Sequence, residues 1–419
     1  PCDVAEHCTG ISASCPGDEF EPDGTTCDDG IYCNGEDTCT GGMCVEHTGN
    51  PCTDDSLFCN GAENCYELEK QCLSSGDPCV APQICDEGSD DCVTSGSGDW
   101  WNSDWDYRKL LTIDHTKVDD DLTNFPVLID LTDSDLATFA QSNGNEIVFT
   151  DTNGIKLNHE IELYDDLNGH LIAWVNIPSL SSTEDTTVYL YFGNSEAGSQ
   201  ESPGNTWDHN YVMVQHLEEI SGTHLDSAGN GNDGTATTGT DQGALGGLQG
   251  ADGFDGVDDY VNCGNAASLD ITGSMTVEAW VYSENGAAVP QRIAAKDKVG
   301  VVGKFIFWEN SSGNLAFIVA DPGSTWYRAQ GNSVTDGTWM HVVGVFDAQS
   351  RQVRLYRDGV ELTAVAGPAS LKSNPETLTI GAADNNGHNW NGIIDEVRIS
   401  TVPRSAGWIS TSYSNQSNP

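Results

Sequence analysis

The feature that most constrains this chain is a regular series of cysteines in its first 92 residues. Fourteen of the 15 cysteines lie there, and the last is Cys263. Cys2, Cys27, Cys52 and Cys79 recur at intervals of 25, 25 and 27 residues. Two further sets of cysteines recur at similar intervals, one with Cys33, Cys59 and Cys85 and the other with Cys39, Cys65 and Cys92. This spacing predicts four copies of a small structural unit, each of about 25 residues, across residues 1–93.

A dense set of cysteines in a short segment is typical of a disulfide framework, which forms in oxidising surroundings outside the cytosol. Residues 1–98 carry 21 acidic side chains, one basic side chain (Lys70) and no tryptophan. They cannot bury enough apolar surface to fold unaided, whereas each disulfide adds about 2–4 kcal/mol. Zinc is a weaker interpretation, because the segment has no Cys-x-x-Cys pair. The predicted disulfide cysteines, with their pairing left open, are Cys2, Cys8, Cys15, Cys27, Cys33, Cys39, Cys44, Cys52, Cys59, Cys65, Cys72, Cys79, Cys85 and Cys92.

The charge of the chain is strongly negative: 16 Lys and Arg stand against 65 Asp and Glu, a formal net charge of −49. Nucleic acids and anionic membrane surfaces attract clustered basic side chains, so we expect neither as a partner. No apolar run is long enough for insertion into a bilayer. Two interpretations of the acidity stay open: solubility in a salty or calcium-rich medium, and several dedicated calcium sites.

The first repeat contains the phrases Cys-Asp-Val-Ala-Glu-His-Cys-Thr-Gly, Ser-Cys-Pro and Asp-Gly-Thr-Thr-Cys between Cys2 and Cys27. This segment resembles part of the disintegrin domain of membrane-anchored metalloproteases, and it is also similar to cysteine-rich repeats of bacterial surface proteins. The second resemblance fits better, since the chain has no His-Glu-x-x-His motif and no Arg-Gly-Asp. We also expect the polypeptide to begin upstream, because Pro1-Cys2 matches the end of the phrase Gly49–Cys52.

Beyond a flexible linker at residues 94–98, short runs of β-branched and aromatic residues replace the cysteines. Two groups of such runs, at 99–194 and 207–401, flank a second linker at 195–206. We expect the C-terminal tail at 402–419 to continue in a longer polypeptide. The predicted fold class is therefore mainly β: a disulfide-rich repeat segment followed by two β-sandwich domains. The expected strands are 109–113, 125–131, 146–150, 157–163, 171–177 and 187–192, and then 211–217, 259–261, 276–282, 304–308, 315–319, 339–346, 352–357, 377–380 and 392–399.

The first sandwich carries the phrases Trp105–Arg108, Asn124–Ile129 and Tyr189–Asn194. They resemble an uncharacterised β-domain that commonly precedes laminin-G-like modules in prokaryotic surface proteins. That resemblance implies no known chemistry.

The second sandwich carries five phrases in a fixed order, Asp226–Gly234, Phe254–Val261, Thr276–Val281, Trp339–Val343 and Ile394–Ile399. Together they closely resemble the laminin-G-like, concanavalin-type jelly roll over residues 207–401. The resemblance implies that the second sandwich is a concanavalin-like jelly roll, and that a metal joins its early loop to the late Ile-Asp-Glu strand.

Calcium takes six to eight oxygen ligands from carboxylates, amides and carbonyls, with tolerant geometry. The loop 226–234 is dense in Asp, Asn and Gly, and Asp395 lies on the late strand. By analogy with the family, Asp226, Asn230, Asn232 and Asp395 are the predicted calcium ligands. The alternative is a Gly-Asn turn without metal, with Asp395 acting as a hydrogen-bond acceptor.

Sugar binding uses the face of an aromatic ring together with nearby amides. The candidates are Trp326, Tyr327, Asn386 and Trp390, which lie between or next to predicted strands. The alternative is that Trp390 packs into the sandwich core and that Trp326 begins a strand.

No catalytic residue is predicted, because the chain lacks a Gly-x-Ser-x-Gly motif, a phosphate loop and the alternating carboxylates of jelly-roll glycosidases. We expect an extracellular or cell-surface, non-enzymatic protein for adhesion or for binding a polysaccharide or a surface protein, with a calcium-stabilised jelly roll on a disulfide-rich stalk. Two alternatives stay open: a self-assembling subunit of an extracellular filament, sheath or matrix, and an accessory binding region of a larger secreted enzyme.

Overall fold

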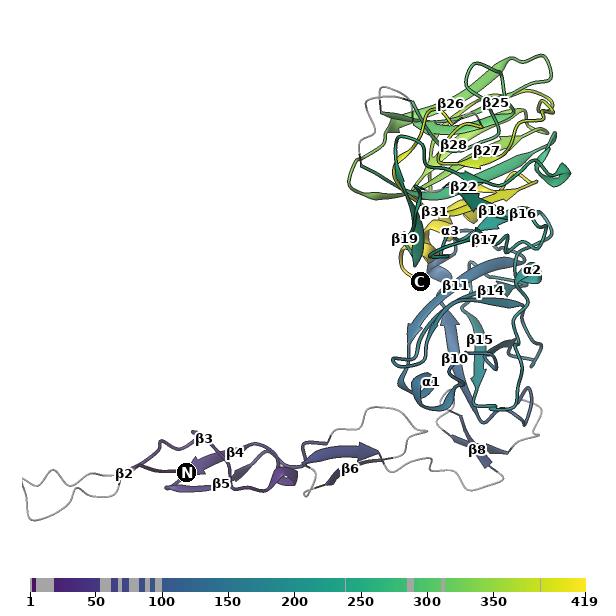
Figure 1. The fold of residues 1–419 in the computed structure, drawn as a ribbon. Coiled ribbons are helices and arrows are strands. Elements are labelled where there is room, and N and C mark those ends of the chain that lie inside the picture. The colour runs from purple at the N-terminus through teal and green to yellow at the C-terminus, as the bar shows by residue number, and fades with distance from the viewer. Residues whose placement is uncertain are drawn as a thin grey trace, which may run out of the picture. The chain divides into compact units, whose positions relative to one another are not determined.

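A computed structural model describes residues 2–4, 19–52, 62–66, 70–74, 83–86, 91–94, 100–237, 239–284, 290–309, 313–384 and 386–419. The chain forms two compact units, one up to Leu110 and one from Leu111 to Pro419. Both are built mainly from β-strands, and the larger unit contains two β-sandwiches (Figure 1). The predicted fold class is therefore confirmed. Among the described residues, no helix is long and apolar enough to cross a membrane.

The cysteine-rich unit consists of short antiparallel strand pairs. Its elements are β1 (Asp3–Val4), β2 (Glu19–Phe20), β3 (Thr26–Cys27), η1 (Tyr32–Asn34), β4 (Asp37–Thr40), β5 (Met43–His47), β6 (Glu63–Tyr66), β7 (Gln71–Ser74), β8 (Gln83–Asp86) and β9 (Asp91–Thr94). Three hairpins repeat one arrangement, with facing pairs Cys39–Cys44, Cys65–Cys72 and Cys85–Cys92. Cys85 is thus equivalent to Cys39 and Cys65, so the predicted register of the last copy, which aligned Cys85 with Cys33, is wrong.

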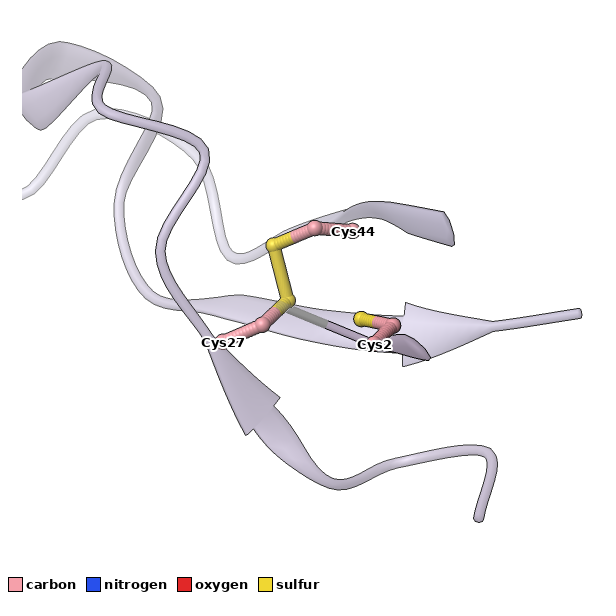
Figure 2. A group of neighbouring side chains, drawn as sticks. All are labelled: Cys2, Cys27 and Cys44. Carbon is pink, nitrogen blue, oxygen red and sulfur yellow. A yellow bond between two sulfur atoms is a disulfide. The ribbon is translucent and has the colours of Figure 1, made fainter. Parts of the chain in front are cut away.

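Four disulfides lie among the described residues, and they follow two patterns. Cys27–Cys44 and Cys52–Cys72 each close one copy, whereas Cys2–Cys39 and Cys33–Cys65 join neighbouring copies. Figure 2 shows the Cys27–Cys44 bond beside Cys2. Sulfur held in these bonds is not available as the thiolate that zinc binds. The predicted bonds of Cys8, Cys15, Cys59 and Cys79, and the side chains of Cys85 and Cys92, lie outside the described part of the chain.

The first sandwich has two three-stranded sheets, ordered β10-β15-β12 and β11-β14-β13. Its elements are β10 (Tyr107–Ile113), η2 (His115–Lys117), β11 (Phe125–Thr132), α1 (Ser134–Phe139), β12 (Val148–Asp151), β13 (His159–Asp165), β14 (His170–Ile177), β15 (Thr186–Phe192) and α2 (Pro203–Thr206). Each strand matches a predicted run to within two residues at either end. Alternating apolar residues and turn signals were therefore sufficient to locate these strands.

The second sandwich has two eight-stranded sheets. One runs β19-β20-β31-β22-β27-β28-β29, with β16 paired to β31, and the other runs β17-β18-β21-β30-β23-β24-β25-β26. The elements are β16 (Tyr211–Gln215), β17 (Thr223–His224), β18 (Gly234–Ala236), β19 (Asp241–Leu245), β20 (Gly250–Asp255), β21 (Val261–Asn262), η3 (Ala267–Leu269), β22 (Met275–Ser283), β23 (Gln291–Ala295), β24 (Phe305–Glu309), β25 (Asn314–Ala320), β26 (Trp326–Ser333), β27 (Trp339–Asp347), β28 (Gln352–Arg357), β29 (Val360–Ala366), β30 (Thr379–Ile380) and β31 (Asn391–Ser400).

The core of this sandwich lies between its two sheets, and Val277, Ala279 and Val281 of β22 belong to it. Their neighbours Glu278 and Trp280 are also buried, with 3% and 7% of their surface exposed. β22 is therefore covered on both faces, because additional segments of the same unit pack over the outer one. Cys263 is a buried free cysteine, as the sequence indicated, and burial raises the pKa of its thiol.

One of those covering segments is α3 (Ala406–Ser417), a helix within the predicted tail at 402–419. Ser405 caps it, since its hydroxyl oxygen accepts from the Trp408 amide at 3.1 Å. The Trp280 indole donates to Gln416 at 2.6 Å, while the Asn415 side chain bonds both backbone groups of Leu128 in the first sandwich, at 2.7 and 2.8 Å. The helix thus links the two sandwiches (Figure 1).

Candidate functional site

A groove lies at the start of β26 in the second sandwich, where Trp326 is placed. Its floor includes Ile306 on β24 and Ile318 on β25, which face each other across the two strands. Phe305 and Phe307 belong to the sandwich core, so strand alternation turns the intervening Ile306 to the opposite face. The groove encloses about 350 Å³, which is within the range of small-ligand sites.

Basic side chains gather around Trp326 in this groove. Lys298 and Arg328 are exposed, and Arg292 is buried in an ion pair with Asp297 at 2.9 Å. These are three of only 16 Lys and Arg residues in a chain of net charge −49. Asp297 also lines the groove and offsets the charge of Arg292, so the positive charge of the lining comes from Lys298 and Arg328. His388, which also lines it, has a pKa lowered first by burial and then by Arg292.

The four predicted ligand-binding residues do not share one site. Trp326 lines the groove half-buried, and it also begins strand β26, as the alternative interpretation held. Tyr327 is half-buried against the core, and its hydroxyl donates to Asp321 at 3.4 Å. Asn386 is exposed in a left-handed conformation, and its side-chain oxygen accepts from Asn389 at 2.6 Å.

Trp390 does not take the predicted role of a ligand-binding surface aromatic. Its ring is 0% exposed and forms part of the core between the two sheets. A ring in that position has no free face for a ligand. The physical reason is that Trp390 directly precedes β31, a strand flanked by β20 and β22 in the middle of its sheet.

Three of the predicted calcium ligands do lie in one loop. The two carboxylate oxygens of Asp226 accept from the amides of Val214, Ala228 and Asn232, at 3.0, 3.1 and 3.0 Å. The amide groups of Asn230 and Asn232 donate to the backbone oxygens of Tyr211 and Val212. These bonds close the loop around a buried carboxylate. Burial raises the pKa of Asp226, and the backbone donors oppose that shift.

Asp395 forms hydrogen bonds with a different loop. Its Oδ2 accepts from the amides of Gly247 and Leu248, at 2.8 and 3.3 Å. Burial and the adjacent Glu396 raise its pKa well above the usual value. Asp226 thus accepts hydrogen bonds from its own loop and from Val214, whereas Asp395 accepts them from Gly247 and Leu248. Calcium at these positions stays a prediction from the sequence.

A cluster of charged side chains, which the sequence did not indicate, joins the two sandwiches. Glu160 and Glu162 come from β13 of the first sandwich, whereas His216 and Glu396 come from the second. His216 Nδ1 lies 2.6 Å from Glu396, and Nε2 lies 3.5 Å from Glu160. Burial opposes protonation of His216, but Glu396 and Glu160 outweigh it and raise its pKa well above the usual value.

The backbone of Glu396 explains why sequence alternation missed this cluster. Its φ is +52°, and the register of β31 against β22 shifts at this point. Such a bulge rotates the following side chains relative to a regular strand. Glu396 therefore reaches His216, while Arg398 bonds Glu396 and lies over the rings of Trp174 and Trp207, at 4.2 and 4.8 Å from their centroids. The cluster is an interdomain contact made of charged and aromatic groups.

The geometry thus describes a two-sandwich protein with an aromatic and basic groove on its second sandwich. Residues 255–410 match a laminin-G model described as the concanavalin A-like lectin/glucanases superfamily. Residues 143–232 match a domain of unknown function, DUF2341. The chain therefore contains a concanavalin-like domain, although the match begins later than the predicted residue 207. It also extends past the predicted end at residue 401, because it includes the first part of α3.

Solved structures of low sequence identity also resemble the chain. The receptor-binding domain of botulinum neurotoxin mosaic serotype C/D is 12% identical, with a TM-score of 0.41 over 49% of this chain and 50% of that one. The binding domain of Paraclostridial Mosquitocidal Protein 1 is 14% identical, with a TM-score of 0.40 over 49% and 52%. The ligand-binding domain of botulinum neurotoxin serotype D, solved with N-acetylneuraminic acid, is 14% identical, with a TM-score of 0.40 over 51% and 52%. This chain spans about half the length of these structures. No curated protein matches it.

Proposed function

We propose that this is a secreted or cell-surface binding protein, and not an enzyme, whose concanavalin-like domain holds a carbohydrate bearing acidic groups. The groove around Trp326 carries the proposal, because it combines a half-buried indole with Lys298 and Arg328. An indole packs against the apolar face of a sugar ring, and a guanidinium bonds carboxylate or sulfate oxygens in pairs. An acidic chain has few basic residues, so their concentration at one groove favours an anionic ligand.

The other parts of the proposal rest on different observations. An extracellular location is supported by the disulfides, which form in oxidising compartments. A non-enzymatic role is supported by the lack of recognised catalytic motifs in the sequence. The resemblance of the repeats to disintegrin and bacterial surface repeats supports a stalk that presents the sandwiches. Adhesion is the proposed outcome of that presentation.

Binding of the intact chain to immobilised polysaccharides would test this proposal. We expect retention of sulfated or uronic-acid polysaccharides over neutral ones, with affinity that falls as salt screens the basic groups. Trp326→Ala should weaken binding about tenfold, the loss of roughly 1.4 kcal/mol that an aromatic contact supplies. Arg328→Ala should reduce both the affinity and its salt dependence.

Arg354→Ala is the matched control, because Arg354 is a partly exposed arginine on the other sheet, paired with Glu361 at 3.6 Å. It should bind like the unaltered protein. Equal binding by the Trp326→Ala variant, or a preference for neutral polysaccharides, would show that the groove is not the binding site. A failure to bind any polysaccharide would overturn the carbohydrate proposal as a whole.

A further inference from the structure

Lys296 is a buried amine in the second sandwich that belongs neither to the groove nor to the charged cluster. It directly follows β23, and it is 0% exposed. Its Nζ donates to the backbone oxygen of Glu376 at 2.5 Å and to the side-chain oxygen of Asn265. Lysine is almost never fully buried unless its charge is paired, and both of these acceptors are neutral groups. The position of this amine therefore calls for a chemical explanation.

Three strands of one sheet bring Lys296 and Asn265 together. β30 pairs with β21 on one side and with β23 on the other. β21 and β23 are both antiparallel to β30, so they end at the same edge of the sheet. Lys296 comes directly after β23, and Asn265 lies three residues after β21. The two side chains thus meet beside the residues that precede β30, where the Leu378 amide donates to the Gly264 oxygen at 2.8 Å.

The surroundings of Lys296 favour the neutral form of its amine. Burial lowers its pKa first, and the charge of Lys304 lowers it further, to about 8, although the carboxylates of Asp270, Glu376 and Asp384 oppose the shift. At pH 7 this pKa leaves about one amine in ten neutral, compared with fewer than about one in a thousand for an ordinary lysine. The neutral amine is the nucleophilic form of lysine, and burial beside a second cation is a known way to produce it.

Asn265 supplies a carbonyl carbon next to this amine. Its side-chain amide is held from both ends, because the oxygen accepts from Lys296 and the nitrogen donates to the Pro375 oxygen at 2.7 Å. Asn265 is exposed as a residue, so a small product formed at its side chain can leave into solvent. The pair therefore combines a nucleophile, an uncharged electrophile and a route of escape for the leaving group.

The other buried lysine of this region has a different partner. Lys304 is also 0% exposed, but it pairs with the carboxylate of Asp270 at 2.5 Å. Burial opposes ionisation of Asp270, whereas hydrogen bonds from Lys304 and Ser373 outweigh it and lower its pKa. An ionised carboxylate repels an attacking electron pair, so Lys304 and Asp270 form an ion pair. The neutral amide at Asn265 has no such protection.

We propose that Lys296 and Asn265 form an intramolecular amide bond that joins the chain after β21 to the chain after β23. Nζ of Lys296 bonds to Cγ of Asn265, the bond from Cγ to the side-chain nitrogen breaks, and that nitrogen leaves as ammonia. The proton that Nζ gives up goes to the leaving nitrogen, so no further reactant is consumed. Glu376 is the carrier of this proton, since its Oε2 is buried and has no hydrogen-bond partner among the described residues.

The bond closes a loop, because Lys296 lies 31 positions after Asn265. A covalent link of this kind stabilises a fold chiefly by restricting the unfolded chain. Unlike the disulfides of the first unit, an amide bond is not opened by reducing agents. The second sandwich thus has its own covalent cross-link, although its one cysteine, Cys263, is free.

The mass of the intact, fully reduced chain tests the proposal. We expect it to lie below the mass calculated from the sequence by one ammonia. Asn265→Ala, at an exposed position, and Lys296→Arg, which keeps the positive charge without the amine, should each have their calculated mass. A tryptic digest of the unaltered chain should contain a branched peptide that joins Lys296 to Asn265. Asn265→Ala should also melt roughly 10 °C lower, because its unfolded chain is no longer restricted.

Asn262→Ala is the matched control, because Asn262 is an exposed asparagine of the same segment whose side-chain oxygen accepts from the Gly264 amide at 2.8 Å. It should keep the deficit of one ammonia. A calculated mass for the unaltered chain would overturn the proposal, as would a deficit that persists in Asn265→Ala or in Lys296→Arg. A deficit of one water would place the bond at a carboxylate and would also overturn it. These measurements need no carbohydrate, so they are independent of the proposed function.

Discussion

Replacing Arg398 with alanine tests whether the charged and aromatic cluster between the sandwiches stabilises the protein. Arg398 is 1% exposed, bonds Glu396 and lies over Trp174 and Trp207 at 4.2 and 4.8 Å. Arg398→Ala leaves Glu396 buried with His216, at 2.6 Å, as its remaining charged partner, so this change by itself costs an amount at the lower end of the range of about 3–5 kcal/mol for a broken buried ion pair. The two lost cation–π contacts, each worth about 1–2 kcal/mol when desolvated, place the expected loss near the upper end of that range.

Urea unfolding followed by tryptophan fluorescence measures this loss. With a slope of about 3 kcal/mol per molar urea, the midpoint should fall by about 1 M or more. Arg398 and Trp174 come from different sandwiches, so the variant should also separate their unfolding into two steps. Arg354→Ala is the control: its ion pair with Glu361 is 28% and 42% exposed, so it should cost less than about 1 kcal/mol. A midpoint for Arg398→Ala no lower than that of Arg354→Ala would refute the role assigned to the cluster.

Two further predictions concern pH and redox conditions. Burial lowers the pKa of His224, but hydrogen bonds to Asp252 and Glu219 outweigh it and raise the pKa from 6.5 to about 9. The stability that protonated His224 contributes should be complete below pH 6.5 and lost as the pH rises to about 9, in total about 3 kcal/mol. His224→Gln should flatten that part of the curve of unfolding free energy against pH, and an unchanged slope would contradict the assignment. A reducing agent should open residues 1–94 to proteases while residues 111–419 stay resistant, because the described disulfides lie in the first unit and Cys263 in the second is free. Mass spectrometry would locate the cuts, and equally rapid cleavage within the sandwiches would count against this expectation.

The sequence determined the features that depend on local pattern. Periodic cysteines predicted disulfide-linked repeats, and alternating runs located the strands of the first sandwich to within two residues. Five ordered phrases identified the concanavalin-like domain that the family match supports. Cysteine spacing, the two-residue period of a strand and turn residues are all properties of neighbouring positions, so they can be read without the fold.

The tertiary structure decided which side chains meet. It buried Trp390 in the core and left Trp326 in a basic groove, although both looked alike in the sequence. Backbone amides donate hydrogen bonds to Asp226, whereas one oxygen of Asp259 has no donor among the residues that the structure describes. A bulge at Glu396, in the middle of β31, turned that part of the strand into an interdomain contact. These outcomes depend on residues far apart in the chain, because burial and hydrogen-bond partners are set by how sheets and sandwiches pack, and no local pattern records that packing.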